Sequence, residues 1–495
     1  ALTRSSNISG TKLGPQPESP TPRDIRLGGY PVFYVRTIID GWPMHGLPLT
    51  YRYICSFWLP LAGTWVMMAV EGPYLAAIIA RLPSPTENLA AFGVAFSFAI
   101  IIEAPVIMLM AASTALVGSY ASYLALRRFA YGLGIALTLI QAVAVLPPVF
   151  PWIGETLVGL PPEVSRLAHQ GLALMLPWPI AIGYRRFRQG LLIHHNLTRR
   201  VALGTVLRLT TMTVTALAAA QVIGLRGIHV AALALSVGVV VEAAASRLMT
   251  RELVARLRLQ DNSDADREPT LTLRTIVHFY VPLGMTSVLG MAIQPAVTFF
   301  MGQSRFPLES LAVLPVVHGL TFVFRAIGLS FQEVGIALLG EHTEHYRQLR
   351  TFAAWLAIAT AGGMSLIVYT PLATVWFQEV SGLSPELTQF ALLPARILVW
   401  IPAGSVWISF QRSVLVHGRD TRAITRASAL EVLGVGIVLA VTLQTLSWVG
   451  AVGAATAIVI GRLIGNLSLI APVGRMTRRA PRPDMVGSPS ATTVG

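Results

Sequence analysis

Charged side chains stand inside long apolar segments of this chain. If those segments cross a bilayer, each charge costs at least about 2.5 to 3.5 kcal/mol near the membrane centre unless it meets water, a partner or a proton. Charges kept at that cost bind a solute, carry a proton or form an ion pair, so they are the first candidates for function. They are Glu71, Glu103, Arg208, Glu242, Arg325, Glu333, Arg396, Glu431 and Arg462.

An internal repeat matches charges of opposite sign. Residues 57–118 resemble residues 279–340 without a gap at a shift of 222 positions, and the match resumes near residue 179 at a shift of 223. Glu103 thereby corresponds to Arg325, near the predicted membrane centre. The acid can exchange a proton and the arginine can hold an anionic group, so both are predicted to bind substrate. A static ion pair between them that locks the two halves together is the alternative.

The repeat also matches Arg208 with Glu431. Both residues lie about two turns inside the predicted cytoplasmic ends of their helices, and we predict that they too bind substrate. Snorkelling of the side chains to the inner interface is the alternative.

Glu71 stands directly before Gly72 and Pro73, and the second half has Gln294 and Pro295 at the matching place. Proline removes a hydrogen bond from a helix and kinks it, which leaves carbonyl oxygens free for a solute or ion. We therefore predict an ion-coupling role for Glu71 and a substrate-binding role for Gln294. For Glu71, exposure to water near the outer interface is the alternative.

Other motifs predict packing or topology rather than chemistry. The basic residues Arg185, Arg186, Arg188 and Arg412 either attract an anion or serve as topology signals. No metal site or cofactor is expected, because the histidines lack partners at metal spacing and Cys55 is the single cysteine. No strand precedes the glycine clusters, so they predict close helix packing rather than nucleotide loops. These glycines are Gly132, Gly134, Gly434, Gly436, Gly450, Gly453, Gly461 and Gly465.

The amino-acid composition indicates whether the chain folds in water or in a membrane. Its 495 residues are 54% hydrophobic and 12% charged, with a mean hydropathy of +0.64. So much apolar surface cannot be covered in one soluble core, which predicts a polytopic integral membrane protein. The net charge of +14 does not indicate nucleic acid as a partner, because the basic residues lie between apolar runs, as positive-inside topology requires.

Apolar stretches of about 20 residues predict twelve transmembrane helices, six in each half. With both termini in the cytoplasm, the outer loops hold only Arg81, Arg166, Arg226 and Arg305, and six helices per half make the halves parallel repeats. The predicted helices are 53–79, 89–117, 129–149, 168–184, 201–222, 228–246, 277–301, 310–339, 351–377, 387–411, 424–446 and 449–470. The predicted domains are a cytoplasmic tail with an interfacial segment (1–52), a six-helix bundle (53–246), a cytoplasmic linker (247–276), a second six-helix bundle (277–470) and a disordered tail (471–495).

The opening segments of the two halves, residues 57–61 (FWLPL) and 279–283 (FYVPL), resemble those of the multidrug, oligosaccharide-lipid and polysaccharide (MOP) exporter superfamily. Within it, residues 89–97 (LAAFGVAFS), 189–192 (QGLL) and 401–404 (IPAG) are most similar to the progressive-ankylosis branch. The resemblance covers residues 53–470. It implies an all-helical, V-shaped, MATE-like fold, alternating access, and export of small anions. The family's basic residue before the seventh-helix proline is Gln294 here, which leaves the substrate class open.

The sequence therefore predicts a secondary active exporter of a small organic solute, with an organic anion as one candidate class, in the cell (inner) membrane. No nucleotide-binding motif is present, so a gradient of H⁺, Na⁺ or the substrate itself would supply the energy. We expect membrane lipid around a monomer and no enzymatic activity. A cation-coupled multidrug exporter and a flippase of lipid-linked intermediates are the alternatives within the carrier class. A lipid-processing membrane enzyme and a structural subunit are the alternatives outside it.

Overall fold

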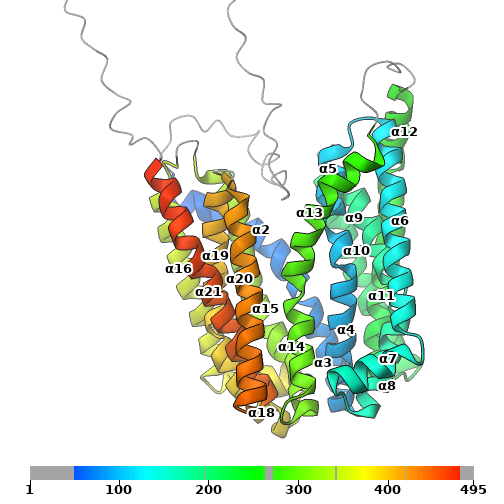
Figure 1. Ribbon diagram of the computed structural model, residues 1–495, viewed down its shortest axis with the longest axis vertical. Helices are drawn as coiled ribbons and strands as arrows, with labels where there is room; N and C mark the ends of the chain where they lie inside the picture. Colours follow the sequence, from blue (N-terminus) through cyan, green and yellow to red (C-terminus); the bar gives the residue numbers. More distant parts are fainter. Residues whose placement is uncertain (1–48, 196, 262–270, 341–342, 418–419, 480–495) are drawn as a thin grey trace, which may run out of the picture.

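The computed structural model describes residues 49–195, 197–261, 271–340, 343–417 and 420–479, which form helices joined by short loops (Figure 1). The first half contains α2 (Tyr51–Ala69), α3 (Glu71–Ala80), α4 (Pro85–Ile107), α5 (Leu109–Leu116), α6 (Tyr120–Ala144), α7 (Val149–Pro151), the π-helix η2 (Trp152–Val158), α8 (Pro162–Leu174), α9 (Trp178–His194), α10 (Thr198–Leu217), the π-helix η3 (Ala218–Val222) and α11 (Gly227–Met249).

A connecting helix, α12 (Arg251–Asp261), follows the first half. The second half contains α13 (Leu273–Met291), α14 (Ile293–Gly302), α15 (Pro307–Leu338), α16 (Tyr346–Val368), α17 (Leu372–Thr374), the π-helix η4 (Val375–Val380), α18 (Pro385–Leu398), α19 (Trp400–His417), α20 (Thr421–Leu439), the π-helix η5 (Ala440–Thr445) and α21 (Gly450–Arg479).

The repeat in the sequence is a repeat in the structure. Helices α2, α3 and the start of α4 recur as α13, α14 and the start of α15 at a shift of 222 positions. At a shift of 223, the starts of α8, α10 and α11 recur as the starts of α18, α20 and α21. Even the π-helical segments have counterparts, η2 with η4 and η3 with η5. The two matching series of helices confirm the predicted pseudo-symmetric all-α fold.

Each half supplies the predicted six spans. Among the described residues, ten helices are long and apolar enough to cross a membrane. The fourth and seventh predicted spans, which are not among these ten, are present as the helix pairs α8–α9 and α13–α14. Large apolar side chains on the outer faces are open to the surroundings, for example Trp355 at 67% and Ile358 at 65% exposure. Such an apolar exterior belongs in lipid, so the chain is an integral membrane protein.

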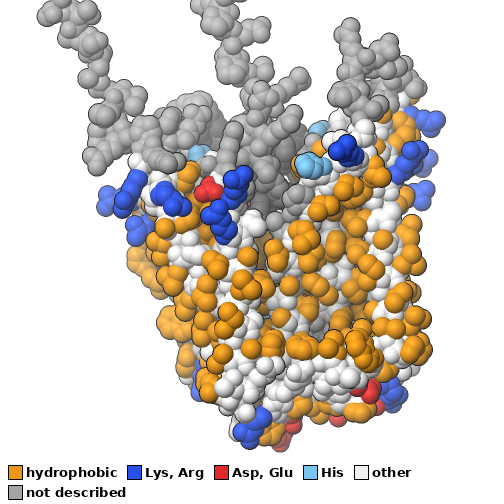
Figure 2. Space-filling model, in the orientation of Figure 1, with side chains coloured by type: hydrophobic (Ala, Val, Ile, Leu, Met, Phe, Trp, Pro, Cys, Tyr) orange, Lys and Arg blue, Asp and Glu red, His pale blue; other side chains and the backbone are white. Residues whose placement is uncertain are grey.

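The helix ends are sorted by charge. Figure 2 shows hydrophobic side chains over the flanks of the molecule and most basic side chains around one end. We call this the basic end; α12 and the last turns of α21 lie there (Figure 1). At the other end, here called the far end, Figure 2 shows a few basic and acidic side chains together. Helix α8 and the start of α18 lie at the far end (Figure 1).

The first helix of each half packs against the other half. Helix α2 lies along α15, where Trp58 donates a hydrogen bond to Ser330 Oγ at 2.9 Å. In return, α13 packs on α4 and α6, and the Tyr280 hydroxyl donates to the Pro105 carbonyl oxygen. Each half therefore packs its first helix against the other half. The predicted division into two bundles at residue 246 did not include this exchange of helices.

Two predicted boundaries differ from the structure. Part of the segment predicted as a linker is helix α12, because Leu253 and Leu257 stand one turn apart and bury their side chains on the same face. The last helix, α21, runs to Arg479 instead of ending at residue 470, and it carries Pro472 within it. The interfacial segment and tail predicted at 1–52 and the end of the C-terminal tail fall almost entirely outside the described residues.

Several of the predicted packing glycines lie in tight helix contacts. A Cβ atom on Gly461 of α21 would lie 2.4 Å from Val435 Cγ2 and 3.0 Å from the Glu431 carbonyl oxygen of α20. A Cβ would meet neighbours at 2.6 Å on Gly434, 2.2 Å on Gly450 and 2.3 Å on Gly453, and at 3.3 Å on Gly134 and 3.1 Å on Gly465. Around Gly132 and Gly436, by contrast, a Cβ would meet nothing within 4 Å.

We predict that Gly461→Ala destabilises the protein by about 1 to 3 kcal/mol, because the added methyl group overpacks the α20–α21 contact. Gly436→Ala on the neighbouring helix is the matched control and should be neutral or stabilising by up to about 1 kcal/mol, since alanine favours helix. Thermal unfolding of both variants in detergent measures the difference. Equal melting temperatures would contradict this account of the packing.

Candidate functional site

The first half holds a chain of buried ion pairs on four different helices. Arg208 of α10 lies between two glutamates: its Nη2 donates to Glu71 of α3, and its Nε lies 3.3 Å from Glu242 Oε2 of α11. Arg185 of α9 approaches the same Glu242 oxygen at 2.7 Å. Gln189, one turn further along α9, donates to the other Glu242 oxygen at 3.2 Å. Two arginines and two glutamates thus balance one another away from water.

The local sequence explains how these side chains meet. The helix is interrupted at Val70, three residues before Pro73, so Glu71 opens a new helix that contacts α10 and α11. Gly238 lets α10 and α11 approach closely, since a Cβ there would lie 3.3 Å from the Arg208 carbonyl oxygen. The predicted interruption beside Glu71 is therefore present, and Glu71 lies in a buried ion pair rather than in open water.

Glu103 lies near this network and is also buried. Its carboxylate accepts a hydrogen bond from the Trp178 indole at the start of α9. Arg186, Arg185 and Arg208 interact with it electrostatically. No hydrogen bond or ion pair joins Glu103 to Arg325 in the described part of the chain. The static lock between halves, which was the alternative explanation for these two residues, is not formed in this conformation.

The second half contains a matching cluster. Glu431 of α20 pairs with Arg462 of α21 at 3.0 Å, and both side chains are buried. Arg325 of α15 and Arg412 of α19 lie close enough to interact electrostatically with this pair. Arg412 donates to Ser428 Oγ at 3.1 Å. The side chains at Arg208 and Glu431 are therefore both held inside their halves by ion pairs rather than extended to the membrane surface.

The two clusters have opposite polarity. In the first half the arginine stands on the fifth span and its glutamate on the sixth, as Arg208 and Glu242. In the second half the glutamate is on the fifth span and the arginine on the sixth, as Glu431 and Arg462. The Glu242 position itself corresponds to Gly465 at a shift of 223, and a Cβ there would lie 3.1 Å from Glu431 Oε2. The repeat preserved an ion pair between the same two helices while its sign was exchanged.

Several buried or partly buried arginines have no carboxylate within ion-pair distance among the described residues, including Arg188, which donates to Thr250 Oγ1 at 2.6 Å. Arg325 makes no hydrogen bond there, Arg412 reaches only Ser428, and Arg186 reaches only Met110 Sδ at 3.9 Å. Around Arg325, the second half thus gathers Arg325, Arg412 and Arg462 against the single acid Glu431. A buried cation without a counter-charge is costly, and water or an anionic solute would relieve that cost.

The remaining predicted residue, Gln294, is partly buried near the start of α14, beside Pro295. It belongs to neither cluster. Glu333 of α15 lies apart as well, and it accepts a hydrogen bond from Trp65 of α2. Within the described residues, no group of three histidine, cysteine or acidic side chains is placed to hold a metal ion.

The sequence-based site omitted seven residues that form or adjoin these clusters: Glu242, Arg462, Arg185, Arg186, Gln189, Arg412 and Trp178. Glu242 and Arg462 carried a usable signal, because both are charges inside apolar segments. Arg185 was visible only as one of several basic residues at the end of a span. Trp178 gave no signal, since an aromatic residue at a helix start is ordinary in membrane proteins.

Comparisons with known proteins identify the fold. No protein-family model matches the chain, and no curated protein matches its sequence. The structure is similar to an inward-facing multidrug resistance transporter of the MATE family, in the MOP superfamily. That match has 15% identity and a TM-score of 0.63, and it covers 91% of this chain and 100% of the other. This chain has the MATE-like fold.

Two further structures share the MATE-like fold of this chain. The lipid II flippase MurJ, in an inward closed conformation, matches with 13% identity and a TM-score of 0.64 over 84% of this chain and 87% of MurJ. A MOP superfamily transporter from Pyrococcus furiosus matches with 15% identity and a TM-score of 0.59 over 85% of this chain and 96% of the other. For that protein, a binding pocket of reverse polarity was taken to suggest a different function.

We predict that Glu242→Gln lowers stability by about 3 to 5 kcal/mol, because Arg185 is left buried without a counter-charge while Arg208 keeps Glu71. The double variant Glu242→Gln/Arg185→Gln should recover much of that loss, since the unpaired cation is removed with its partner. A double-mutant cycle of melting temperatures measures the coupling. Additive losses in the double variant would show that the two side chains do not depend on each other.

Proposed function

We propose that this protein is a secondary active transporter that exports a small organic anion across the cell membrane by alternating access between its two halves. The observation that carries the proposal is the excess of arginine over glutamate around Arg325, within a membrane-spanning bundle. A guanidinium that has no protein partner presents several donors to a carboxylate or phosphate group. The MATE-like fold supports transport, and these charges favour an anion over a cationic drug.

The ion pairs of the first half suggest how transport is coupled to a gradient. We propose that Glu71 is the coupling acid. When Glu71 is ionised, Arg208 is shared between Glu71 and Glu242; when a proton neutralises Glu71, Arg208 is left to Glu242, which already pairs with Arg185. Protonation would therefore change the charge balance at the junction of α3, α10 and α11, next to the interruption at Val70.

The orientation follows from the distribution of charge. We propose that the basic end faces the cytoplasm, because basic residues accumulate on the cytoplasmic side of membrane proteins. Anionic inner-leaflet lipid would then surround the basic helix ends. We further propose that the chain is related to the progressive-ankylosis branch of the superfamily, whose export of small anions would fit such a substrate. Gln294 would contribute a neutral hydrogen-bonding group beside the charged ones. We propose that the chain works as a monomer and has no enzymatic activity.

A flippase for a lipid-linked intermediate is the second candidate. The likeness to MurJ, with a TM-score of 0.64, favours it, and lipid intermediates with a phosphate-containing head group would also suit unpaired arginines. The two candidates differ in what must accompany the anion. A water-soluble anion needs only the polar clusters, whereas a lipid-linked anion also needs a path for its chain between the halves.

We predict that citrate, pyrophosphate or ATP raises the melting temperature of the purified protein and that cationic dyes such as ethidium do not. Arg325→Ala should abolish this stabilisation, and Glu103→Gln should abolish flux of the stabilising anion in proteoliposomes. Arg396→Ala is the matched control, because Arg396 is exposed, donates to the Val368 carbonyl oxygen and lies over the Tyr369 ring. Stabilisation by the dyes alone would favour the multidrug alternative. Unchanged transport in both site variants would remove Glu103 and Arg325 from the pathway.

We predict that Glu71→Gln transports without regard to an imposed pH gradient, because a neutral side chain at this place cannot bind or release the coupling proton. The measurement is the flux of the stabilising anion into proteoliposomes with and without the gradient. Glu155→Gln, at an exposed acid of η2, should keep the dependence of the unmodified protein. Retained dependence in Glu71→Gln would assign coupling to another group.

A further inference from the structure

The far ends of the two halves are joined by side chains that bind backbone across the molecule. Arg81 follows α3 in the first half, and its guanidinium crosses to the end of the π-helix η4 in the second half. There Nη2 donates to the carbonyl oxygens of Glu379 and Val380, the latter at 2.9 Å. Nη1 donates to the Ala77 carbonyl oxygen of its own half at 2.7 Å, so the guanidinium binds both halves at once.

A second contact runs in the opposite direction. Gln303 follows α14 in the second half, and its side-chain amide donates to the Leu157 carbonyl oxygen at 2.7 Å. Leu157 is the next to last residue of the π-helix η2 in the first half. Each half therefore extends one side chain into the end of a π-helix on the other half.

The two contacts are equivalent under the repeat. Gln303 matches Arg81 at a shift of 222, and Val380 matches Leu157 at a shift of 223. Gly93 and Pro315 also match at a shift of 222, and a Cβ on Gly93 would lie 3.1 Å from Pro315 Cγ. Because these two equivalent positions touch, they lie at the axis that relates the halves. Arg81 and Gln303 thus make equivalent contacts that are related by a pseudo-twofold axis.

The receiving backbone is shaped for this approach. Each π-helix is followed by a glycine with positive φ: Gly159, at 79°, comes directly after η2, and Gly382, at 75°, is the second residue after η4. A Cβ on Gly382 would lie 3.0 Å from Arg81 Nη1, and one on Gly159 would lie 3.2 Å from the Gly302 carbonyl oxygen. The last carbonyl groups of a helix lack partners within the helix and carry its negative end charge, so they attract a donor, a cation most strongly.

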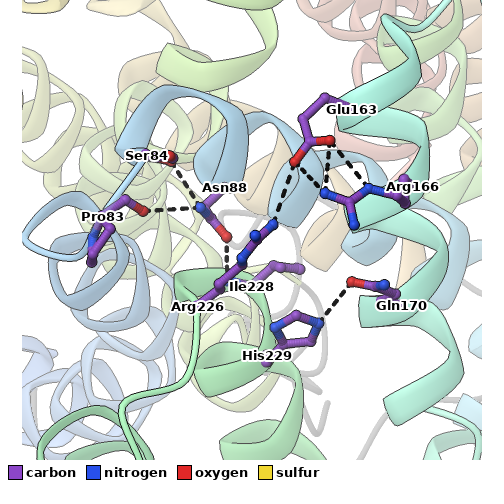
Figure 3. A network of polar contacts seen from close by, with 9 residues as sticks. All are labelled: Pro83, Ser84, Asn88, Glu163, Arg166, Gln170, Arg226, Ile228 and His229. Carbon is purple, nitrogen blue, oxygen red and sulfur yellow. Dashed lines mark hydrogen bonds and ion pairs between the residues drawn. The ribbon is translucent and has the colours of Figure 1, made fainter.

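The loop after Arg81 is held by its own polar network (Figure 3). The Asn88 amide donates to the carbonyl oxygens of Pro83 and Ser84 at 3.1 and 2.8 Å and accepts from the Ile228 backbone nitrogen at 3.0 Å. In the second half, Ser310 occupies the place of Asn88 and accepts from the Ala451 backbone nitrogen at 3.1 Å. Both loops are therefore anchored to the sixth span of their own half.

An exposed ion pair beside this loop belongs to the first half alone. Glu163 accepts from Arg166 at 2.6 Å and lies 3.4 Å from Arg226 (Figure 3). The hydrogen bonds from Arg166 lower the pKa of Glu163, so the carboxylate stays charged at neutral pH. Arg226 therefore resembles Arg81 in type and location, but it makes no bond to the second half among the described residues.

We propose that Arg81 and Gln303 form a gate at the far end: they hold the far ends of the two halves together in this conformation and release when the far side opens. This inference rests on the proposed function, because alternating access requires the far side to open. The charged member, Arg81, binds two carbonyl oxygens and the neutral member binds one, so Arg81 contributes more to closure. The halves then part by breaking bonds to backbone, and their buried ion pairs stay intact.

The test measures the distance between the far ends directly. Spin labels replace Glu155 of η2 and Glu386 of α18, both exposed, in a chain whose exposed Cys55 is first changed to serine. Electron–electron double resonance in nanodiscs then reports closed and open populations. Arg81→Ala should shift the ratio of open to closed on the order of tenfold, and Arg81→Ala/Gln303→Ala should shift it further. Arg226→Ala is the matched control and should leave the distances unchanged.

Arg81→Gln provides a second, milder variant, because it places the same amide in both halves and should give an opening between those of the unmodified protein and Arg81→Ala. Melting temperatures identify any variant that fails to fold. Distances in the folded double variant equal to those of the unmodified protein would overturn the proposed gate. The distance measurement needs no transported solute. If the gate opens as expected while the protein transports no anion, the proposed function is wrong and the proposed gate is still supported.

Discussion

A charge inside a membrane is costly without a counter-charge, and the buried ion pairs of this chain are each formed within one half. Arg208 and Arg185 pair with glutamates of the first half, and Arg462 pairs with Glu431 of the second. Breaking a buried pair leaves an uncompensated charge and costs several kcal/mol. The interface between the halves is built instead from helix packing, a few neutral hydrogen bonds and the far-end contacts of Arg81 and Gln303. The halves can therefore change their relative positions without exposing the most costly groups to lipid.

The two halves have matching helices, but their buried charges do not match. Matching spans carry an ion pair of opposite polarity, so the two clusters are not copies. The first cluster is balanced, whereas the second has arginines in excess around Arg325. Under the proposed function this difference gives the halves different tasks: protonation acts on the balanced network around Glu71, and an anion is attracted to the basic cluster around Arg325.

Much of the fold could be predicted from the sequence, because its causes are local. Apolar length gives the spans, proline and glycine mark the interruptions, and the repeat relates the halves. The exchange of α2 and α13 between the halves could not be predicted, since it depends on which apolar surfaces meet, and apolar surfaces are alike in sequence. The helical part of the linker was missed for a related reason: two buried leucines in a basic segment are too weak a periodic signal.

The candidate site was predicted in part. Intramembrane charge identified Glu71, Glu103, Arg208, Arg325 and Glu431 as candidates, because a charged residue inside an apolar segment is visible in the sequence without knowledge of its neighbours in space. Their partners could not be derived, since pairing depends on distances across several helices. A static pair of Glu103 and Arg325 was the alternative to substrate binding, and it is not formed because equivalent positions of a repeat need not lie together. Gly93 and Pro315 meet near the axis, whereas Glu103 turns to Trp178 and Arg325 stays beside Arg412.

The claim that the halves move as separate units with intact internal ion pairs is tested most directly by a cryo-electron microscopy structure of the conformation that is open at the far end. The account predicts that Arg208 and Arg185 still pair with Glu242, that Arg462 still pairs with Glu431, and that Arg81 has left the carbonyl groups of η4. A structure in which these arginines have exchanged their glutamate partners between the halves would contradict it.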